Sequence, residues 1–250
     1  MFINERANAI IEYLRIHKKA TISELAEHLY ASESTVRRDL AEMQSSGLIA
    51  RYHGGAILLD GSGEVSIFAR AERDAAAKEA CALNAIEKLD GLIKYNTIFI
   101  DNSSTCLTLA KKLDFAKKTV ITNGLHIALA LEQKPHIELI LLGGIVNSST
   151  SAITGALSIR TLENLSIDLA LTSCAALNLH GSYELSLETA QLKQVALSNS
   201  KHKVLIAADN KLDTDAMYRV ALITDYDFVI TNASDEAVKP YKASGANIYN

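Results

Sequence analysis

The stretch of sequence that decides the fold runs Ala31-Ser32-Glu33-Ser34-Thr35-Val36-Arg37-Arg38-Asp39-Leu40. Ser32 is a favourable N-cap, because its hydroxyl can accept a backbone N–H of the first helical turn. Val36, Leu40 and Met43 follow at four- and three-residue steps, which is the spacing of one buried helix face. The pattern therefore predicts a helix that begins near Ser32 and packs this apolar face inward.

The rest of this helix carries small hydroxyl and cationic side chains, namely Ser34, Thr35, Arg37 and Arg38. They cannot all lie on the buried face, and such side chains near a helix start suit phosphates and base edges of DNA. We expect Asp39 to orient the two arginines, or to cap a neighbouring group, rather than to contact DNA. The alternative is an ordinary surface helix with two solvated arginines.

The preceding segment predicts the partner helix of a helix-turn-helix. Thr21-Ile22-Ser23-Glu24 has the pattern of a capping box, which starts a helix. Only Tyr30-Ala31 separates that helix from the next, and two short helices joined by so tight a turn must cross. A further helix is predicted over residues 4–17, with Lys18-Lys19 at its carboxyl end, where the helix dipole favours cations.

A predicted hairpin follows the second helix. Gly47 is placed to end that helix in a left-handed cap. Residues 48–59 are predicted to form two short strands around a His53-Gly54-Gly55 turn. Such a hairpin is a wing, and Arg51 and His53 near its tip can reach a phosphate or the minor groove. A hairpin in which His53 has no such role stays open as the alternative.

Composition and charge limit these interpretations. The 250 residues are 48% apolar and 22% charged, which is ordinary for a globular protein. The net charge is −4, and residues 1–60 carry seven Lys/Arg against eight Asp/Glu, a local net of −1. DNA binding must therefore depend on where the charges lie rather than on their sum.

The sequence also favours a cytoplasmic location. It holds no apolar run of about eighteen residues, so no membrane span is expected. The first six residues mix charges and lack the apolar core of a secretory signal. Cys81, Cys106 and Cys174 match no metal spacing and are interpreted as small buried hydrophobic residues. We expect no metal and no cofactor.

A polar, glycine-rich break at residues 60–63 separates the chain into two parts. We expect a winged helix-turn-helix domain at 1–58, a linker at 59–74 and a second domain at 75–250. Apolar strands are predicted in the second domain at 97–100, 120–122, 137–142, 169–172, 204–208, 228–230 and 246–249. Helical segments between them indicate an α/β domain with a mainly parallel sheet covered on both faces.

Polar residues and glycines gather where these strands end. In an open parallel sheet, ligands bind beyond the carboxyl ends of the strands. Hydroxyls and backbone N–H groups at a helix start can hold an anion, and charges of both signs suit a sugar phosphate. The alternative is that these residues only cap helices or face solvent. The candidates are Asp101, Ser103, Ser104, Thr105, Asn123, Gly143, Gly144, Glu188, Lys193 and Lys211.

These motifs together resemble the DeoR family of bacterial transcriptional regulators. Four segments carry the resemblance in the first domain: Ser23-Glu24-Leu25-Ala26, Thr35-Val36-Arg37-Arg38-Asp39-Leu40, Gly47-Leu48 and Arg51-Tyr52-His53-Gly54-Gly55-Ala56. Residues 68–232 are similar to the family's sensor domain, whose fold resembles ribose-phosphate isomerases and glucosamine-phosphate deaminases. The resemblance implies that the candidate positions, together with Gly155, Asp168 and Asp209, hold a phosphorylated sugar as effector.

The sequence departs from the family pattern at four places: Asn102, the glycine-free run 172–176, the short 209–211 spacing, and Asn232 in place of Asp. These departures concern the identity of the effector more than the fold.

We therefore expect a sequence-specific repressor of a carbohydrate catabolism operon that is relieved by a phosphorylated sugar. It binds a double-stranded DNA operator as a homo-oligomer, a dimer or tetramer, since two half-sites need two copies. One alternative is a sugar-phosphate isomerase or deaminase that carries a DNA-binding domain, with Asp101 or Glu188 as base. That enzyme would need a second, close carboxylate, which the sequence does not reveal. The other alternative is an activator.

Overall fold

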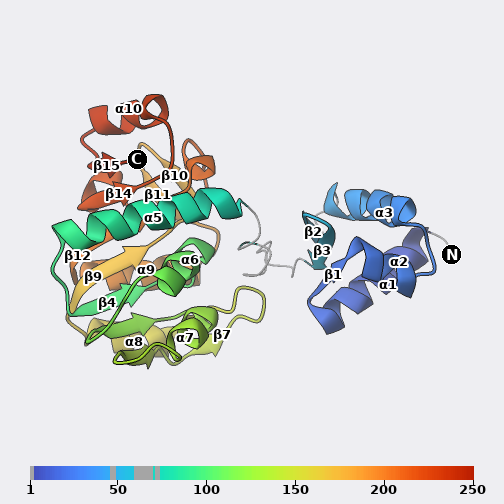
Figure 1. Cartoon of the computed structure of the whole chain (residues 1–250), viewed down its shortest axis with the longest axis horizontal. Coiled ribbons are helices and arrows are strands. Elements are labelled where there is room, and N and C mark those ends of the chain that lie inside the picture. Colours follow the sequence, from blue (N-terminus) through green and yellow to red (C-terminus); the bar gives the residue numbers. More distant parts are fainter. Residues whose placement is uncertain (1–2, 46–48, 59–69, 71–73) are drawn as a thin grey trace. The chain divides into compact units, whose positions relative to one another are not determined.

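The computed structural model describes residues 3–45, 49–58, 70 and 74–250 (Figure 1). The chain forms two compact units, Met1–Asp74 and Ala75–Asn250. Each unit has its own buried apolar core. The cap predicted at Gly47, the break at residues 60–63 and most of the linker predicted at 59–74 lie outside the described residues.

The first unit is a winged helix-turn-helix. In chain order its described elements are α1 (Ile3–His17), β1 (Lys19–Thr21), α2 (Ile22–His28), α3 (Glu33–Ser45), β2 (Ile49–Tyr52) and β3 (Gly55–Leu58). The strands form an antiparallel sheet in the order β1-β3-β2. The helix-turn-helix and the hairpin predicted from the sequence are confirmed.

Strand β1 was not predicted. The sequence analysis placed Lys19 at the end of the first helix, whereas the structure ends α1 at His17. Lys18 adopts a left-handed backbone conformation with φ of 67°, which turns the chain. Lys19 then pairs with Ile57 of β3, and this pairing attaches the wing to the helices.

Local hydrogen bonds explain both ends of α2. The Thr21 N–H donates to Glu24 Oε2 at 2.7 Å and the Glu24 N–H donates to Thr21 Oγ1 at 3.2 Å, which confirms the capping box. At the other end, the Ala31 N–H donates to the Ala26 carbonyl at 3.0 Å while Tyr30 has φ of 49°. This is a Schellman turn in which Tyr30 occupies the position that usually holds glycine.

The apolar face of α3 packs as predicted. Val36, Leu40 and Met43 are buried in a core that includes Ile10 and Leu14 of α1. The Thr35 N–H donates to Ser32 Oγ at 3.2 Å, which confirms the predicted cap. Because this face points inward, the opposite face of α3 points to solvent.

The second unit contains more strands than the sequence predicted. Its described strands are β4 (Thr97–Ile100), β5 (Thr119–Thr122), β6 (Glu138–Leu141), β7 (Ile145–Val146), β8 (Ile153–Thr154), β9 (Ile167–Thr172), β10 (Ala176–Asn178), β11 (Gly181–Glu184), β12 (Ser200–Ile206), β13 (Tyr218–Ala221), β14 (Phe228–Ile230) and β15 (Ile248–Tyr249). Its described helices are α5 (Ala75–Leu92), α6 (Ser104–Lys112), α7 (Leu125–Leu131), α8 (Ala156–Glu163), α9 (Leu187–Ser198), η1 (Asp209–Lys211), η2 (Ile223–Asp225) and α10 (Asp235–Ala243).

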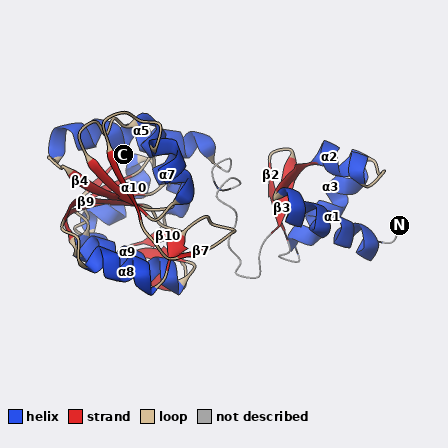
Figure 2. Ribbon diagram, turned by 90° about the horizontal axis from the view of Figure 1, so that it is seen from below, coloured by secondary structure: helices blue, strands red, loops and turns tan. Residues whose placement is uncertain are grey.

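Seven strands form a parallel sheet in the order β15-β14-β12-β9-β4-β5-β6. All seven correspond to predicted strands, so the predicted α/β fold class is confirmed. The antiparallel sheet β10-β11-β13 and the hairpin β7-β8 were not predicted. Helices α5 and α7 lie on one side of the parallel sheet, and α8 and α9 lie on the other (Figure 2).

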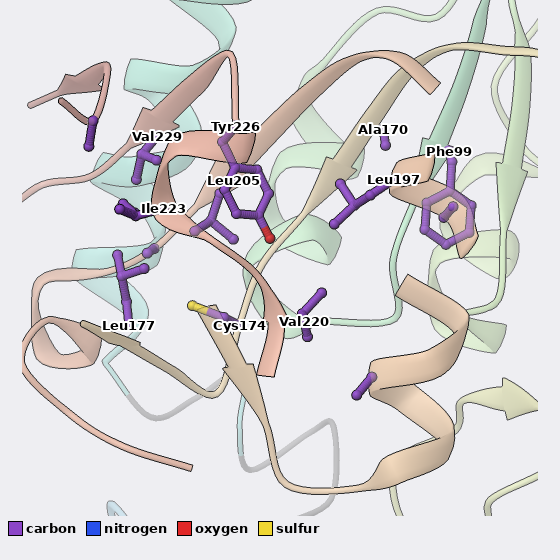
Figure 3. Close-up of a cluster of buried hydrophobic side chains, with 14 of the residues drawn as sticks. Phe99, Ala170, Cys174, Leu177, Leu197, Leu205, Val220, Ile223, Tyr226 and Val229 are labelled. Atoms are coloured by element: carbon purple, nitrogen blue, oxygen red, sulfur yellow. The ribbon is translucent and has the colours of Figure 1, made fainter. Parts of the chain in front are cut away.

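One large cluster of buried apolar residues joins the parallel sheet to α9 and to the smaller antiparallel sheet. Figure 3 shows Leu205 of the parallel sheet beside the ring of Tyr226, and Val229 of β14 and Val220 of β13 belong to the same cluster. The Tyr226 hydroxyl shares a hydrogen bond of 2.7 Å with Ser182 Oγ. The antiparallel sheet is therefore packed against the parallel one rather than free in solvent.

The order of the parallel strands places a reversal beside β4. The chain proceeds from β4 to β5 and β6 on one side, and then crosses to β9 on the other side of β4. At such a reversal, two neighbouring loops diverge at the carboxyl ends of the strands and leave a crevice for a ligand. Here these are the loops that follow β4 and β9.

The three cysteines are buried, as predicted. Burial raises the pKa of the Cys81 and Cys174 thiols to about 12, so both stay protonated at neutral pH. A protonated thiol is a poor nucleophile.

None of the described helices combines the length and apolar composition that crossing a bilayer requires.

Candidate functional site

The first candidate site is the outer face of α3 together with the wing. Ser34, Arg37 and Arg38 are exposed and Thr35 is half-buried, while Arg51 and His53 on the wing are exposed. We call these six residues the recognition surface. Ser32 Oγ lies 2.8 Å from Ser34 Oγ and 2.9 Å from Thr35 Oγ1, so three hydroxyls gather at the amino end of α3.

The two arginines differ in their surroundings. Arg37 Nη2 lies 2.8 Å from Glu33 Oε2, one helical turn earlier, and both side chains are exposed. Such surface pairs contribute only about 0.3–0.5 kcal/mol, so DNA can displace Glu33 at little cost. Arg38 forms no ion pair within the described part of the chain.

Asp39 does not orient these arginines, so the first form of that expectation was wrong, whereas the second form, in which Asp39 binds a neighbouring group rather than DNA, agrees with its contacts. Its buried carboxylate accepts Arg6 Nε at 2.7 Å and Arg6 Nη2 at 3.1 Å, and this hydrogen-bonded contact raises the pKa of Arg6. Successive residues of a helix point in directions about 100° apart. Asp39 therefore points away from the exposed side of Arg38 and toward α1. The Arg6–Asp39 ion pair joins α1 to α3, and it keeps the negative charge of Asp39 away from the surface.

The sequence did not indicate that the ring of Tyr30 is exposed beside α3. It is 99% exposed, at the turn just before α3. From the sequence, Tyr30 is predicted only as part of a turn; the structure adds that it occupies the C′ position with φ of 49°, where glycine is usual.

The second candidate site lies at the strand reversal. Asp101, directly after β4, is fully buried. Its Oδ1 accepts the Ser103 N–H at 3.0 Å, and its Oδ2 accepts the Ser173 N–H at 2.8 Å. The same oxygen lies 2.6 Å from Nζ of Lys193, which is only 2% exposed. We call this arrangement the switch-point site.

The ammonium of Lys193 is saturated by protein oxygens. Besides Asp101, it donates to the Ser173 carbonyl at 2.7 Å and to Glu184 Oε1 at 2.5 Å. A lysine has three donors, and these three acceptors use all of them. Lys193 therefore ties together the loops after β4 and β9 and the end of β11.

The charges in this tie explain its protonation. Burial alone would raise the pKa of Asp101, but the charge and hydrogen bond of Lys193 hold it below its ordinary value. Burial likewise opposes the positive charge of Lys193, and Asp101 and Glu184 overcome it, so the pKa of Lys193 is raised. Two carboxylates and one ammonium leave a net charge of −1 in this part of the site.

Glu184 belongs to this tie although the sequence did not mark it, and the effector role predicted for Glu188 stays a prediction. Glu188 is exposed in the first turn of α9, and within the described residues Lys193 forms its ion pairs with Asp101 and Glu184 instead. Glu184 is the last residue of β11, a strand that the sequence analysis did not predict. Two carboxylates, Asp101 and Glu184, are thus close together, which the sequence did not reveal.

The loop after β4 is built around helix α6. Ser103 caps that helix by accepting the Cys106 N–H at 3.1 Å, and Ser104 and Thr105 are buried in its first turn. Asn123 supports this loop: its Oδ1 accepts the Asn102 N–H at 3.1 Å, and its Nδ2 donates to the Ile153 carbonyl at 3.3 Å.

The remaining candidates lie around this centre. Gly143 and Gly144 are exposed after β6, and Ser158 Oγ donates to the Gly143 carbonyl at 2.7 Å. Gly144 has φ of +154°, and a Cβ there would lie 2.4 Å from the Thr154 carbonyl oxygen. Lys211 in η1 is half-buried. Its positive charge favours the thiolate of Cys174 and so opposes the rise in the pKa of that thiol that burial causes.

Asp168 lies at the opposite end of the sheet. It is near the amino end of β9, where its Oδ2 accepts the Asn96 and Thr97 N–H groups at 2.9 and 3.1 Å. The resemblance counted Asp168 among the effector positions, whereas its contacts hold the start of β4.

Comparison with known proteins agrees with this architecture. The DeoR-like helix-turn-helix domain matches residues 6–61, and the DeoR C terminal sensor domain matches residues 73–233. The HTH-type transcriptional regulator GolR of Listeria innocua serovar 6a is 35% identical over 236 residues, which cover 93% of this chain and 91% of that protein. The glycerol-3-phosphate regulon repressor of Escherichia coli K12 is 29% identical over 231 residues, which cover 92% and 90%.

One similar solved structure is a D-ribose-5-phosphate isomerase in complex with phospho-erythronic acid. It matches 54% of each chain at 12% identity, with a TM-score of 0.39, which is too low to support an argument about this protein. The two domain matches and the full-length relatives suffice: the chain belongs to the DeoR family of transcriptional regulators.

Proposed function

We propose that this protein represses an operon for carbohydrate use by binding operator DNA through the recognition surface. A phosphorylated sugar bound at the switch-point site releases the DNA. The observation that carries the proposal is the outward face of α3, where Arg38 is exposed and unpaired within the described residues while the apolar face is buried. A relative that is a glycerol-3-phosphate regulon repressor supports the carbohydrate assignment.

Arginine substitutions test the DNA half of the proposal. Arg38→Ala is expected to weaken operator binding by about 1–3 kcal/mol if the side chain contacts a base edge in two places. Arg37→Ala is expected to cost the same or less, because Arg37 must first leave Glu33. Gel-shift titration against an operator recovered from genomic fragments gives the affinities. Glu33→Gln serves as the control, and it should keep or improve binding. Unchanged affinity in both arginine variants would contradict the proposal.

For the effector, we propose that its phosphate lies against the amino end of α6. Backbone N–H groups and the hydroxyls of residues 103–105 are suited to an anion there. Lys211 and the exposed glycines Gly143 and Gly144 border the same end of the sheet. Asn123 and Lys193 act as positioning residues, because their polar groups already bind protein atoms. Glu184 is the carboxylate best placed to accept sugar hydroxyls, and Glu188 lies further out on α9.

Ser103→Asp separates binding from folding. Aspartate caps helices as well as serine does, so α6 should still begin after residue 103, and urea denaturation of the variant measures the cost of a second carboxylate beside Asp101. Its negative charge should repel a phosphate at the amino end of α6. Titration calorimetry against a panel of phosphorylated sugars is expected to show binding to the wild type and none to the variant. No heat from any sugar with the wild type would remove the effector half of the proposal.

Release of the operator needs only a modest coupling. A hundredfold loss of DNA affinity corresponds to about 2.7 kcal/mol, within the roughly 1–3 kcal/mol common for allostery. Repeating the gel shift with saturating effector measures this factor. An activator would have the same two sites, and the direction of the transcriptional response in a reporter strain separates the two functions.

An isomerase or deaminase is the second candidate function, favoured by the closeness of Asp101 and Glu184. We propose binding without conversion, because both oxygens of Asp101 already accept protein hydrogen bonds and the residue is fully buried. A general base must reach the proton that it removes. An isomerase assay on the full chain should show no turnover, and turnover that Glu184→Gln abolishes would favour the enzyme.

The proposal also includes a homo-oligomer and a cytoplasmic location. One winged domain reads one half-site, so a palindromic operator needs two copies. A repressor must reach the chromosome, and a bacterial chromosome lies in the cytoplasm. Light scattering of the free protein measures its oligomeric state.

A further inference from the structure

An open cleft of about 610 Å³ lies in the first unit, beside the wing. We call it the wing cleft, and its lining residues are Tyr13, His17, Lys19, Thr21, Glu24, Tyr52 and His53. They come from the carboxyl end of α1, from β1, from the amino end of α2 and from the wing turn. Only His53 belongs to the recognition surface, so the cleft is a separate feature.

Hydrogen bonds and ring contacts fix the shape of the wing cleft. The Ile22 N–H donates to the Gly54 carbonyl at 2.7 Å, which holds the wing turn against α2. The rings of Tyr13 and His17 stack with centroids 4.2 Å apart. The Tyr52 ring lies over Gly55, where a Cβ would be 2.5 Å from it. These contacts hold the walls of the cleft in place.

The lining offers cations and donors with a single carboxylate. Lys19, His17 and His53 supply the basic groups. Glu24 is the carboxylate, and its Oε2 already accepts the Thr21 N–H at 2.7 Å and the Thr21 hydroxyl at 2.9 Å. Chiefly these hydrogen bonds, and also the charges of His17 and Lys19, hold the pKa of Glu24 below its ordinary value. Its charge is therefore engaged in the helix cap.

This chemistry matches a sugar-phosphate strand. Lysine and histidine bind phosphate oxygens without regard to sequence, and tyrosine hydroxyls and rings can contact phosphate and sugar. His53 lines the cleft and also lies at the wing tip, so a DNA strand that meets the wing tip lies next to the cleft.

We propose that the wing cleft holds the backbone of one DNA strand beside the half-site, with Lys19 and His17 contacting its phosphates. The proposal rests on DNA binding by the first unit. It adds sequence-independent affinity from residues outside α3, which helps to explain how a region with a net charge near zero binds DNA.

Two adjacent lysines make a matched test. Lys19 lines the cleft, whereas Lys18 is exposed beside it and does not line the cleft. Lys19→Gln and Lys18→Gln remove the same charge from neighbouring positions. Operator and scrambled duplex affinities of the full chain are measured by fluorescence anisotropy across a salt series. Each phosphate contact contributes about 0.9 to the slope of log K against log salt.

Lys19→Gln is expected to lower that slope by about 0.9 and to weaken both duplexes by the same factor. Lys18→Gln should change the slope by much less, and His17→Gln should act as Lys19→Gln does, in smaller measure. Equal slopes for wild type and Lys19→Gln, or equal effects of the two lysine variants, would overturn the cleft proposal. Such a result would leave the repressor proposal intact as long as wild type binds its operator and Arg38→Ala binds it more weakly. Failure of wild type to bind operator at all would overturn both.

Discussion

At the scale of single residues, Lys193 illustrates how burial changes the meaning of a side chain. The sequence marked Lys193 as a ligand for an effector, and that role stays a prediction. In the structure its three donors meet Asp101, Glu184 and the Ser173 carbonyl. A cation that is saturated by the protein holds loops in place, so its first contribution is to the shape of the site.

Replacing Lys193 with methionine should therefore destabilise the second unit. Removal of one partner leaves a buried carboxylate unpaired, which costs about 3–5 kcal/mol. Lys201→Met is the matched control, because Lys201 also pairs with an aspartate but is 66% exposed, and such pairs are worth about 1 kcal/mol or less. Urea denaturation measures both. Equal stability of the two variants would mean that the buried tie contributes little.

Tyr30 gives a residue-scale prediction of the opposite sign. Its φ of 49° lies in the left-handed region, which costs a non-glycine residue about 1–2 kcal/mol. The side chain is 99% exposed, so Tyr30→Gly loses no packing. Glycine also makes the unfolded chain more flexible, which lowers the free energy of unfolding by about 0.5–1 kcal/mol. The expected net result is a gain of about 0.5–1 kcal/mol in stability. Thermal unfolding of the first unit gives the value, and a loss of stability would show that the ring packs against something.

At the scale of elements, strands with strong local signals were predicted and weak ones were not. All seven parallel strands contain apolar residues in succession; the central strands β4, β5 and β9 are almost wholly buried, whereas the edge strand β6 is half-buried or exposed. Strands β10 (ALN), β11 (GSYE) and β13 (YRVA) mix polar with apolar residues, so they contain no continuous apolar run that would mark a strand. Glu184 ends one of the antiparallel strands, and for that reason it was missed while Glu188 on a helix was noticed.

Asp168 joins three elements of the sheet, and its effect on stability should depend on pH. Chiefly the hydrogen bond from Lys201, with the Asn96 and Thr97 N–H groups, holds the pKa of Asp168 well below its ordinary value. A lowered carboxyl pKa stabilises the folded state above the unfolded value of about 3.9, and this stabilisation is lost as the pH falls toward the folded value. Asp168→Asn should thus lower stability at pH 7, with a difference from wild type that shrinks below about pH 4. Denaturation curves at both pH values check this, and a constant difference would contradict it.

At the scale of the whole molecule, the chain consists of two units with separate cores. A recognition surface lies on one unit and the switch-point site on the other. Relief of repression therefore requires coupling from one unit to the other.

Calorimetry of the full chain should show two unfolding transitions. A phosphorylated sugar at about one hundred times its dissociation constant adds about 2.7 kcal/mol to the unit that binds it. For a unit of this size that shift is about 5–10 °C. The transition of residues 75–250 should rise and that of the winged unit should not. Ser103→Asp should abolish the shift, and an equal rise of both transitions would show that the units unfold together.

The sequence by itself determined the winged helix-turn-helix, the seven parallel strands and the edge of the sheet where polar residues gather. These follow from caps, turns and periodicities within a few residues of chain, which sequence displays directly. Only the tertiary structure decided that Asp39 binds Arg6, that Glu184 meets Asp101 through Lys193, and that seven residues line a cleft beside the wing. Each of those contacts joins segments that are distant in the chain, and burial sets its strength.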